Sequence, residues 1–304
     1  MEVNVKDLTT QIAGVTLKNP VMTASGTFGS GLEYSQYIDI NILGALVTKG
    51  VSYDPWLGNP TTRIAETYGG MLNAIGLQNP GAEVFINEHL PFLAKYDTKI
   101  IVNLCGKTLE DYVKVAEVFS NTSVDMYELN ISCPNIKEGG MSFGVDPNMA
   151  AKVVYAVKSH LNAPLIVKLS PNVTDITVIA KAVEEAGADA ISLINTITAS
   201  KINIKTRKKV LSTGSGGLSG PCVKPIAIHM VNRVSQVTKL PIIGMGGIFT
   251  SDDAIEFIMA GAHAIAVGTA NFTNPRATMH ILQGINDFMD QNKIQNLKEI
   301  RGIV

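Results

Sequence analysis

Short apolar runs alternate with longer amphipathic segments along most of this 304-residue chain. The apolar runs have roughly four to six residues each, a length that suits parallel strands buried on both faces. We expect eight strands from this pattern: Pro20–Ala24, Ala45–Thr48, Ile100–Leu104, Met126–Ile131, Leu165–Leu169, Ala190–Ile194, Pro241–Met245 and Ala264–Val267.

The amphipathic segments between these runs predict helices at Leu109–Phe119, Pro147–His160, Ile176–Ala186, Pro221–Val237 and Asp252–Ala260. Several begin at a capping residue or a proline, namely Thr108, Asp146-Pro147, Asp175 and Ser251. The segments EEAGADAISL and IMAGAHAIAVG each place a glycine between a helix and the next strand. This glycine is typical of the position just after a helix end.

Eight buried strands with intervening helices predict a (β/α)₈ barrel that forms one domain over residues 1–304. A doubly wound open sheet is the alternative, but polar residues and glycines follow nearly every strand rather than one switch point. The segment TTQIAGVTLKNP indicates a hairpin ahead of the first strand. Longer connections at 50–99, 134–148 and 197–220 are expected over the carboxyl-terminal face, where long loops usually carry function. The last connection contains five basic residues, interpreted as a solvated surface loop: Lys201, Lys205, Arg207, Lys208 and Lys209.

The bulk composition excludes several classes of function. A net charge of −1 gives no general reason to bind nucleic acid or an anionic membrane. The chain shows neither a signal peptide nor an apolar stretch of about 20 residues. Its three cysteines favour a reducing, cytoplasmic compartment and exclude a self-contained four-cysteine iron–sulfur cluster. The histidines lack metal-ligand spacing, so no metal site is expected.

The octet ELNISCPN places Cys133 just after an apolar strand, among amides and directly before a proline. The closest histidines in sequence are His89 and His160, so a Cys/His nucleophile pair is not indicated. A thiol in this setting is better interpreted as a general base beside hydrogen-bond donors that hold a planar ligand. Cys105 and Cys222 are expected to be small buried hydrophobes.

Two lysines end apolar strands, Lys49 in LVTKGV and Lys168 in IVKLSPN. Buried lysines are costly unless they are paired or functional, although a lysine at a barrel rim can also extend into solvent. A Schiff-base nucleophile, a carboxylate partner and a stabiliser of negative charge on a cofactor remain open as roles. Because both lysines should face the same mouth, function is favoured.

Amides and glycines recur at the same strand ends. Four asparagines, which offer both donors and acceptors, are expected to converge as a ligand cage: Asn73, Asn103, Asn130 and Asn195. After the last two strands, glycine-bearing turns predict a site for a phosphorylated ligand, since phosphate binds there in many barrels. These turns contain Gly246, Gly247, Gly268 and Thr269.

Five segments together resemble class 1 dihydroorotate dehydrogenase over essentially the whole chain: ELNISCPN, IVKLSPN, NAIGLQNPG, GGLSGPCVKPIA and IIGMGGI. GLQNPG and GGLSGPCVKPIA look most like the B-type catalytic subunit. The resemblance implies an FMN-bearing barrel that oxidises (S)-dihydroorotate to orotate in pyrimidine biosynthesis. Cys133 would remove the proton from substrate C5 and the C6 hydride would go to the flavin.

The resemblance also implies roles for binding residues. Lys49 would approach both flavin and substrate carboxylate, and Lys168 would stabilise the negative charge of the reduced ring. The pyrimidine would be held by Asn73, Ala74, Ile75, Gly76, Leu77, Asn130, Asn195 and Thr196. FMN would be held by Ser25, Lys49, Gly50, Asn103, Asn130, Lys168, Ile194, Gly220, Gly246, Gly247, Gly268 and Thr269, the last four around its phosphate. The loop at 134–144 is a candidate lid over the substrate.

The electron acceptor is inferred from motifs that the sequence lacks. The chain shows no strand-linked GxGxxG fingerprint for a dinucleotide and no cluster ligands. The B-type resemblance therefore implies a partner subunit with FAD and a [2Fe–2S] cluster that passes electrons to NAD⁺, with a homodimer of this chain inside a heterotetramer. Alternatives are a fumarate-dependent A-type enzyme without a partner, a Schiff-base lyase or aldolase using Lys168, and a non-catalytic flavin- or phosphate-binding module.

Overall fold

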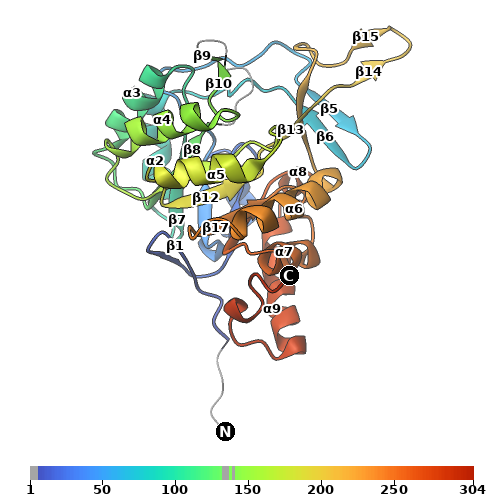
Figure 1. The fold of residues 1–304 in the computed structure, drawn as a ribbon. Helices are drawn as coiled ribbons and strands as arrows, with labels where there is room; N and C mark the ends of the chain where they lie inside the picture. The colour runs from blue at the N-terminus through green and yellow to red at the C-terminus, as the bar shows by residue number, and fades with distance from the viewer. Residues whose placement is uncertain (1–5, 132–136, 139–140) are drawn as a thin grey trace.

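Eight parallel strands close into a barrel at the centre of the molecule (Figure 1). The structure is a computed structural model that describes residues 6–131, 137–138 and 141–304. The predicted barrel and all eight predicted strands are confirmed, and each strand is at most two residues shorter or one residue longer than expected. In barrel order the strands are β3 (Val21–Thr23), β4 (Ala45–Val47), β7 (Lys99–Leu104), β8 (Met126–Asn130), β11 (Leu165–Lys168), β12 (Ala190–Leu193), β17 (Ile242–Met245) and β18 (Ala264–Val267).

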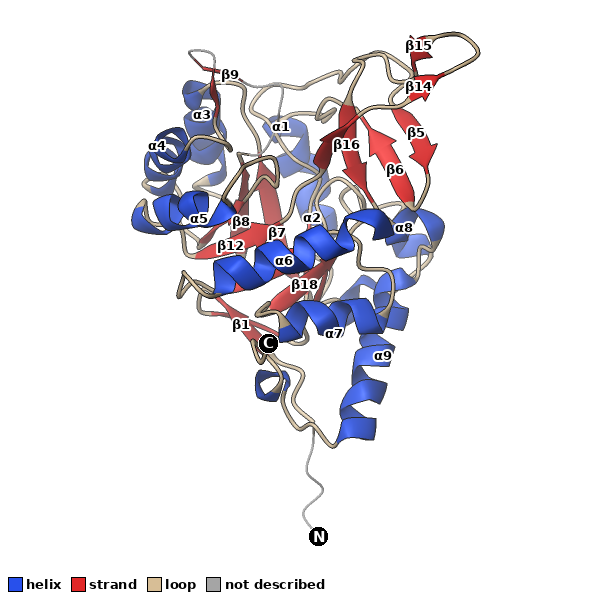
Figure 2. Cartoon of the chain, turned by 45° about the vertical axis from the view of Figure 1, so that its right-hand side comes forward, coloured by secondary structure: helices blue, strands red, loops and turns tan. Residues whose placement is uncertain are grey.

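Helices cover the outside of the barrel because their apolar faces pack on the outward-facing strand residues (Figure 2). All five predicted helices are present, the fourth with a 3₁₀ turn, η4 (Pro221–Val223), as its first part. They are α3 (Leu109–Phe119), α4 (Pro147–Lys158), α5 (Ile176–Glu185), α6 (Lys224–Ser235) and α7 (Ser251–Met259). The sequence interpretation missed two helices after the last strand, α8 (Ala270–Thr273) and α9 (Ala277–Asn292).

Helix ends follow the predicted capping chemistry with one exception. Thr108, Asp146 and Asp175 each accept a hydrogen bond from a backbone N–H in the first helical turn. The prediction for Ser251 was wrong. Thr250 caps α7 in a capping box with Asp253, so Ser251 is already helical.

The glycines predicted after α5 and α7 take the backbone conformation that the turn requires. Gly187 has φ of 99° and Gly261 has φ of 117°. Side chains with a Cβ rarely adopt this left-handed region, which explains glycine at the two helix ends.

The predicted hairpin closes the base of the barrel. Strands β1 (Thr10–Ile12) and β2 (Val15–Leu17) pair in an antiparallel register, with Thr10 opposite Leu17. Ile12 and Leu17 have no exposed surface and pack with the side chains inside the barrel. The amino-terminal end of the barrel is therefore plugged by apolar contacts.

The long connections carry regular structure that the sequence interpretation missed. An antiparallel sheet lies beside the carboxyl-terminal face, in the order β13 (Ile197–Ala199), β16 (Gly216–Ser219), β6 (Gly70–Asn73) and β5 (Ile64–Thr67) (Figure 2). The five basic residues of the last connection are all exposed, as expected, in and around a hairpin of β14 (Ile202–Asn203) and β15 (Lys208–Lys209). The remaining elements are η1 (Tyr34–Gln36), η2 (Ile40–Ile42), α1 (Ala82–Val84), the π-helical η3 (Phe85–His89), α2 (Leu90–Leu93), β9 (Lys137–Glu138), β10 (Met141–Ser142) and η5 (Leu297–Glu299).

The two cysteines expected to be buried behave differently. Cys105 is buried as predicted, whereas the prediction for Cys222 was wrong because its side chain is exposed. Cys222 lies in the turn η4, where its backbone N–H donates to the carbonyl of Gly69 in the β5–β6 turn. Within the described ranges, no helix combines the length and the apolar character needed to cross a bilayer.

Candidate functional site

A cavity of about 660 Å³ opens at the carboxyl ends of the barrel strands. This volume is within the range of cavities that hold cofactors and drug-sized ligands. Its wall is formed by the loops after the barrel strands and by strands β6 and β16 of the antiparallel sheet. The site therefore lies where a (β/α)₈ barrel normally carries its chemistry.

Four polar side chains point into the barrel just below this cavity. They lie two positions after the inward-facing Ile101, Met126, Ile166 and Ala190, on four adjacent strands. Because side chains on a strand alternate between faces, residues two positions later also point inward. These residues are Asn103 on β7, Glu128 on β8, Lys168 on β11 and Ser192 on β12.

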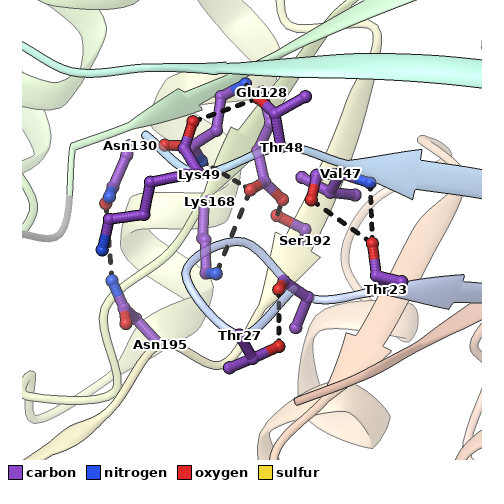
Figure 3. Close-up of polar contacts among 12 residues, drawn as sticks. Thr23, Thr27, Val47, Thr48, Lys49, Glu128, Asn130, Lys168, Ser192 and Asn195 are labelled. Atoms are coloured by element: carbon purple, nitrogen blue, oxygen red, sulfur yellow. Dashed lines mark hydrogen bonds and ion pairs between the residues drawn. The ribbon is translucent and has the colours of Figure 1, made fainter. Parts of the chain in front are cut away.

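The carboxylate of Glu128 contacts the other three polar residues, of which Lys168 and Ser192 are labelled in Figure 3. It accepts hydrogen bonds of 2.7 Å from Asn103 Nδ2 and from the Ser192 hydroxyl, on its two separate oxygens. Lys168 Nζ lies 4.0 Å from Glu128 Oε1. Both charged side chains are buried, at 4% exposure for Lys168 and 1% for Glu128. The lysine lines the cavity, whereas the glutamate lies behind it.

Lys49 enters the cavity from the loop after β4. Its backbone N–H donates to the carbonyl of Gly29, which fixes the start of this loop. Burial lowers the pKa of Lys49, and the positive charges of Lys168 and Arg63 lower it further, against an opposing effect of Cys105. The two lysines therefore repel each other across one cavity, and an anionic ligand between them would relieve that repulsion.

Three of the four predicted asparagines line the cavity together. Asn195 Nδ2 donates to Asn130 Oδ1 at 3.4 Å, as Figure 3 shows, and Asn73 Nδ2 donates to the carbonyl of Gly217 at 3.4 Å. Asn103 is fully buried and is not part of the wall. A Cβ added at Gly50 would lie 2.9 Å from Asn103 Oδ1, so this amide oxygen sits directly behind the backbone that lines the cavity.

The glycine turns after β17 and β18 also lie at the cavity. Gly246 and Gly247 have φ values of 117° and 88°. A Cβ at Gly247 would come within 2.9 Å of the Gly220 carbonyl, so no larger residue fits. Thr269 follows the second turn, and its hydroxyl donates to the Ser219 hydroxyl at 2.8 Å.

The cavity wall contains nearly all the described residues that the sequence pointed to. Gly220 and Asn103 are close by but outside the wall. Those in the wall are Ser25, Lys49, Gly50, Asn73, Ala74, Ile75, Gly76, Leu77, Asn130, Lys168, Ile194, Asn195, Thr196, Gly246, Gly247, Gly268 and Thr269. Cys133 lies outside the described residues, as does much of the candidate lid at 134–144.

The structure adds residues that the sequence interpretation did not select. Glu128 and Ser192 complete the buried polar group, and the only sequence signal for either was a polar residue inside a predicted apolar strand. The wall also includes Thr27, Met71, Phe272 and the segment 215–219. For that segment the pair Gly216-Gly217 was a signal, because a Cβ at Gly217 would collide with the Thr196 side chain at 2.0 Å.

The lining suits a flavin mononucleotide. Lys49 and Lys168 supply positive charge, the amides offer donors and acceptors for the edge of a planar ring, and the glycine turns leave room for a phosphate near backbone N–H groups. Among the described residues, no three His, Cys, Asp or Glu side chains are grouped as metal ligands. The lysines, amides and glycine turns of the wall therefore favour an anionic organic ligand.

Comparisons with known proteins agree with this chemistry. A family described as Dihydroorotate dehydrogenase matches residues 7–289. The chain is 60% identical over 293 residues to "Dihydroorotate dehydrogenase B (NAD(+)), catalytic subunit" of Lachnoclostridium phytofermentans, covering 96% of this chain and 98% of that protein. The protein of the same description from Alkaliphilus oremlandii is 59% identical over 297 residues, covering 98% of each chain. A crystal structure of a DHODH in complex with ferulenol from Eimeria tenella has the same fold, with a TM-score of 0.80, 22% identity, and coverage of 100% of this chain and 90% of that one.

Proposed function

Because this chain belongs to the dihydroorotate dehydrogenase family, we propose that it is the FMN-binding catalytic subunit of an NAD-linked enzyme that oxidises (S)-dihydroorotate to orotate. The observation that carries this proposal is the pairing of two cavity lysines with converging amides and two glycine turns at one barrel mouth. Family membership also favours dehydrogenation over the lyase alternative for Lys168.

The oxidation removes a proton from substrate C5 and a hydride from C6, and a C5=C6 double bond forms. Cys133 is the proposed base for the C5 proton; a free thiol has a pKa near ~8.5, so activity should rise toward alkaline pH. The C6 hydride goes to the flavin, which is the redox chemistry that FMN supplies when bound.

The remaining polar residues bind and orient. The Lys49 ammonium holds the substrate carboxylate. Because its pKa is lowered, Lys49 loses its positive charge at a lower pH than an ordinary lysine, and substrate binding should begin to weaken at that lower pH. Asn73, Asn130 and Asn195 hold the pyrimidine edge together with the segment 74–77 and Thr196. Lys168 opposes the negative charge that reduction adds to the flavin ring. The phosphate would be held by Gly246, Gly247, Gly268 and Thr269, and Ser25, Gly50, Asn103, Ile194 and Gly220 would complete the flavin site.

We further propose that electrons leave this chain through a partner subunit. The relatives are named catalytic subunits, which supports a second subunit in their assemblies. An FAD and a [2Fe–2S] cluster on that partner would connect FMN to NAD⁺, in a heterotetramer built on a homodimer of this chain. A cytoplasmic location fits the three widely spaced cysteines.

The test is an anaerobic absorption spectrum of the purified chain before and after dihydroorotate is added. We expect a flavin band that bleaches on addition of substrate, with orotate formed in equal amount. Reoxidation by fumarate at a turnover rate would instead identify the A-type enzyme, whereas reoxidation by NAD⁺ only after the partner is added supports the B-type. A chain that is colourless after incubation with FMN and removal of the unbound FMN would contradict the proposal.

A further inference from the structure

Glu128 is a buried carboxylate to which the reaction above assigns no role. Over the described parts of the chain, Glu128 and Lys168 are the only fully buried charged side chains. A buried charge is costly to desolvate unless it is paired and hydrogen-bonded. Glu128 meets this condition through two hydrogen bonds and the nearby lysine, and all three contacts are made to groups directly below the cavity.

The contact with Asn103 fixes the orientation of that amide. A carboxylate can only accept hydrogen bonds, so the NH₂ group of Asn103 must face Glu128. The amide oxygen is then forced to point the other way, toward Gly50 at the cavity wall. Asn103 Oδ1 is fully buried and has no hydrogen-bond partner among the described residues. Glu128 thus fixes the Asn103 amide with its oxygen on the side of Gly50 and the cavity.

The contact with Lys168 limits the charge that the ligand meets. Lys168 lines the cavity, while Glu128 lies behind it at 4.0 Å from Nζ. The pair therefore directs its positive end toward the cavity and opposes that charge with a negative one from deeper in the barrel. At short range in a buried site, the negative charge of Glu128 interacts strongly both with Lys168 and with a ligand bound next to Lys168.

We propose that Glu128 is a positioning residue that orients Asn103 and Lys168 beneath the flavin and sets the flavin reduction potential below the value that Lys168 alone would give. This inference rests on the proposed function, because it requires FMN in the cavity. Glu128 is not itself part of the cavity wall, so it acts through the two side chains that it holds.

The experiment measures the two-electron potential of bound FMN in purified holoprotein carrying Glu128→Gln. Loss of the negative charge should favour reduction on the order of tenfold, a potential more positive by about 30 mV. The control is Thr23→Val, which changes a different fully buried polar side chain of the barrel, one whose contacts are with the Val47 backbone on β4. This control should leave the potential unchanged. An unchanged potential in Glu128→Gln would overturn the proposal.

A second pair of variants covers a Glu128→Gln protein that fails to fold. Lys168→Met is compared with the double variant Glu128→Gln/Lys168→Met. In the double variant both positions are neutral, so no unpaired charge is buried. We expect the more positive potential in the double variant, and equal potentials would overturn the proposal. Failure of the proposed function is distinguishable, because wild-type protein would then bind no flavin or would not bleach with dihydroorotate.

Discussion

The two ends of the barrel differ in how they use polar groups: the amino-terminal end is closed by apolar packing, and the carboxyl-terminal end opens into a polar cavity. At the amino-terminal end, the hairpin β1–β2 inserts Ile12 and Leu17 into the barrel. The polar Thr10 and His263 are hydrogen-bonded to each other there. His263 Nδ1 accepts from the backbone N–H of Ile242 at 3.2 Å, and its carbonyl accepts from the Thr10 hydroxyl at 2.8 Å. Both Thr10 and His263 are thus hydrogen-bonded within the protein, although Arg301, which donates to Thr10, has a buried Nε without a partner among the described residues.

At the carboxyl-terminal end, polar groups are directed toward a space. Lys49 and Lys168 bring two positive charges to one cavity, and Asn103 Oδ1 has no hydrogen-bond partner within the described ranges. Such an arrangement costs stability unless a ligand completes it. The base of the barrel is therefore closed by apolar packing, whereas the mouth gathers positive charge and amides around a cavity that suits an anionic, planar molecule.

The largest expected effect concerns the thiol after β8. We expect Cys133→Ser to retain FMN but to lose about 10²–10⁴-fold in kcat, since a serine hydroxyl is a much weaker base and positioned bases contribute in this range. Activity should recover in part at higher pH. Steady-state kinetics across pH, with flavin content measured for each sample, would check this.

The matched control uses another cysteine of the chain. Cys222 is exposed in the turn η4, outside the cavity wall, so Cys222→Ser should keep kcat and flavin content unchanged. Full activity of Cys133→Ser at neutral pH would remove Cys133 from the base role.

Most of the barrel could be predicted because its signals are local. Runs such as Ala264–Val267 are apolar on both faces, as a strand buried on both sides requires, and Thr108 or Asp146 marks a helix start by its own hydrogen bond. The sheet β5–β6–β16–β13 could not be predicted in this way. It pairs Asn73 with Gly217 across 144 residues, and its strands are partly exposed and short.

The site was predictable wherever a residue type was unusual for its position. Lysines at strand ends and paired glycines after strands are such cases, and all of these lie at the cavity. Glu128 was not selected because the sequence does not show which face of its strand points into the barrel; in the structure Glu128 points inward, between Asn103 and Ser192. Cys222 was assigned wrongly because burial of a small residue depends on its tertiary surroundings.

Two glycines, one at each end of the barrel, have similar backbone conformations but different surroundings. Gly247 at the mouth and Gly14 at the base both have positive φ, at 88° and 84°. A Cβ at Gly247 meets the Lys224 side chain at 2.8 Å and the Gly220 carbonyl at 2.9 Å, whereas a Cβ at Gly14 meets nothing within 4 Å. Gly247→Ala must therefore shift the turn, and Gly14→Ala adds only backbone strain.

We expect Gly247→Ala to weaken FMN binding by about 1–3 kcal/mol, the usual cost of a strained backbone that must move. Gly14→Ala should lower the free energy of unfolding by about 1 kcal/mol and leave FMN binding unchanged. Titration of apoprotein with FMN gives the first quantity and urea unfolding the second. Equal FMN affinity in both variants would show that the turn after β17 does not hold the phosphate.

The smallest effect concerns the pH dependence of stability at the amino-terminal end of the barrel. Burial, aided by the positive charge of Arg301, lowers the pKa of His263 from its ordinary value of 6.5 to about 4. The unfolded chain therefore binds a proton at higher pH than the folded chain, so stability falls as pH drops from 6.5 toward 4. Because His263 is partly exposed, we expect a loss of about 1–2 kcal/mol, measured by urea unfolding across this range. His263→Asn keeps an acceptor for the Ile242 N–H without titrating, and an acid loss as large as that of the wild type would assign the pH dependence to other groups.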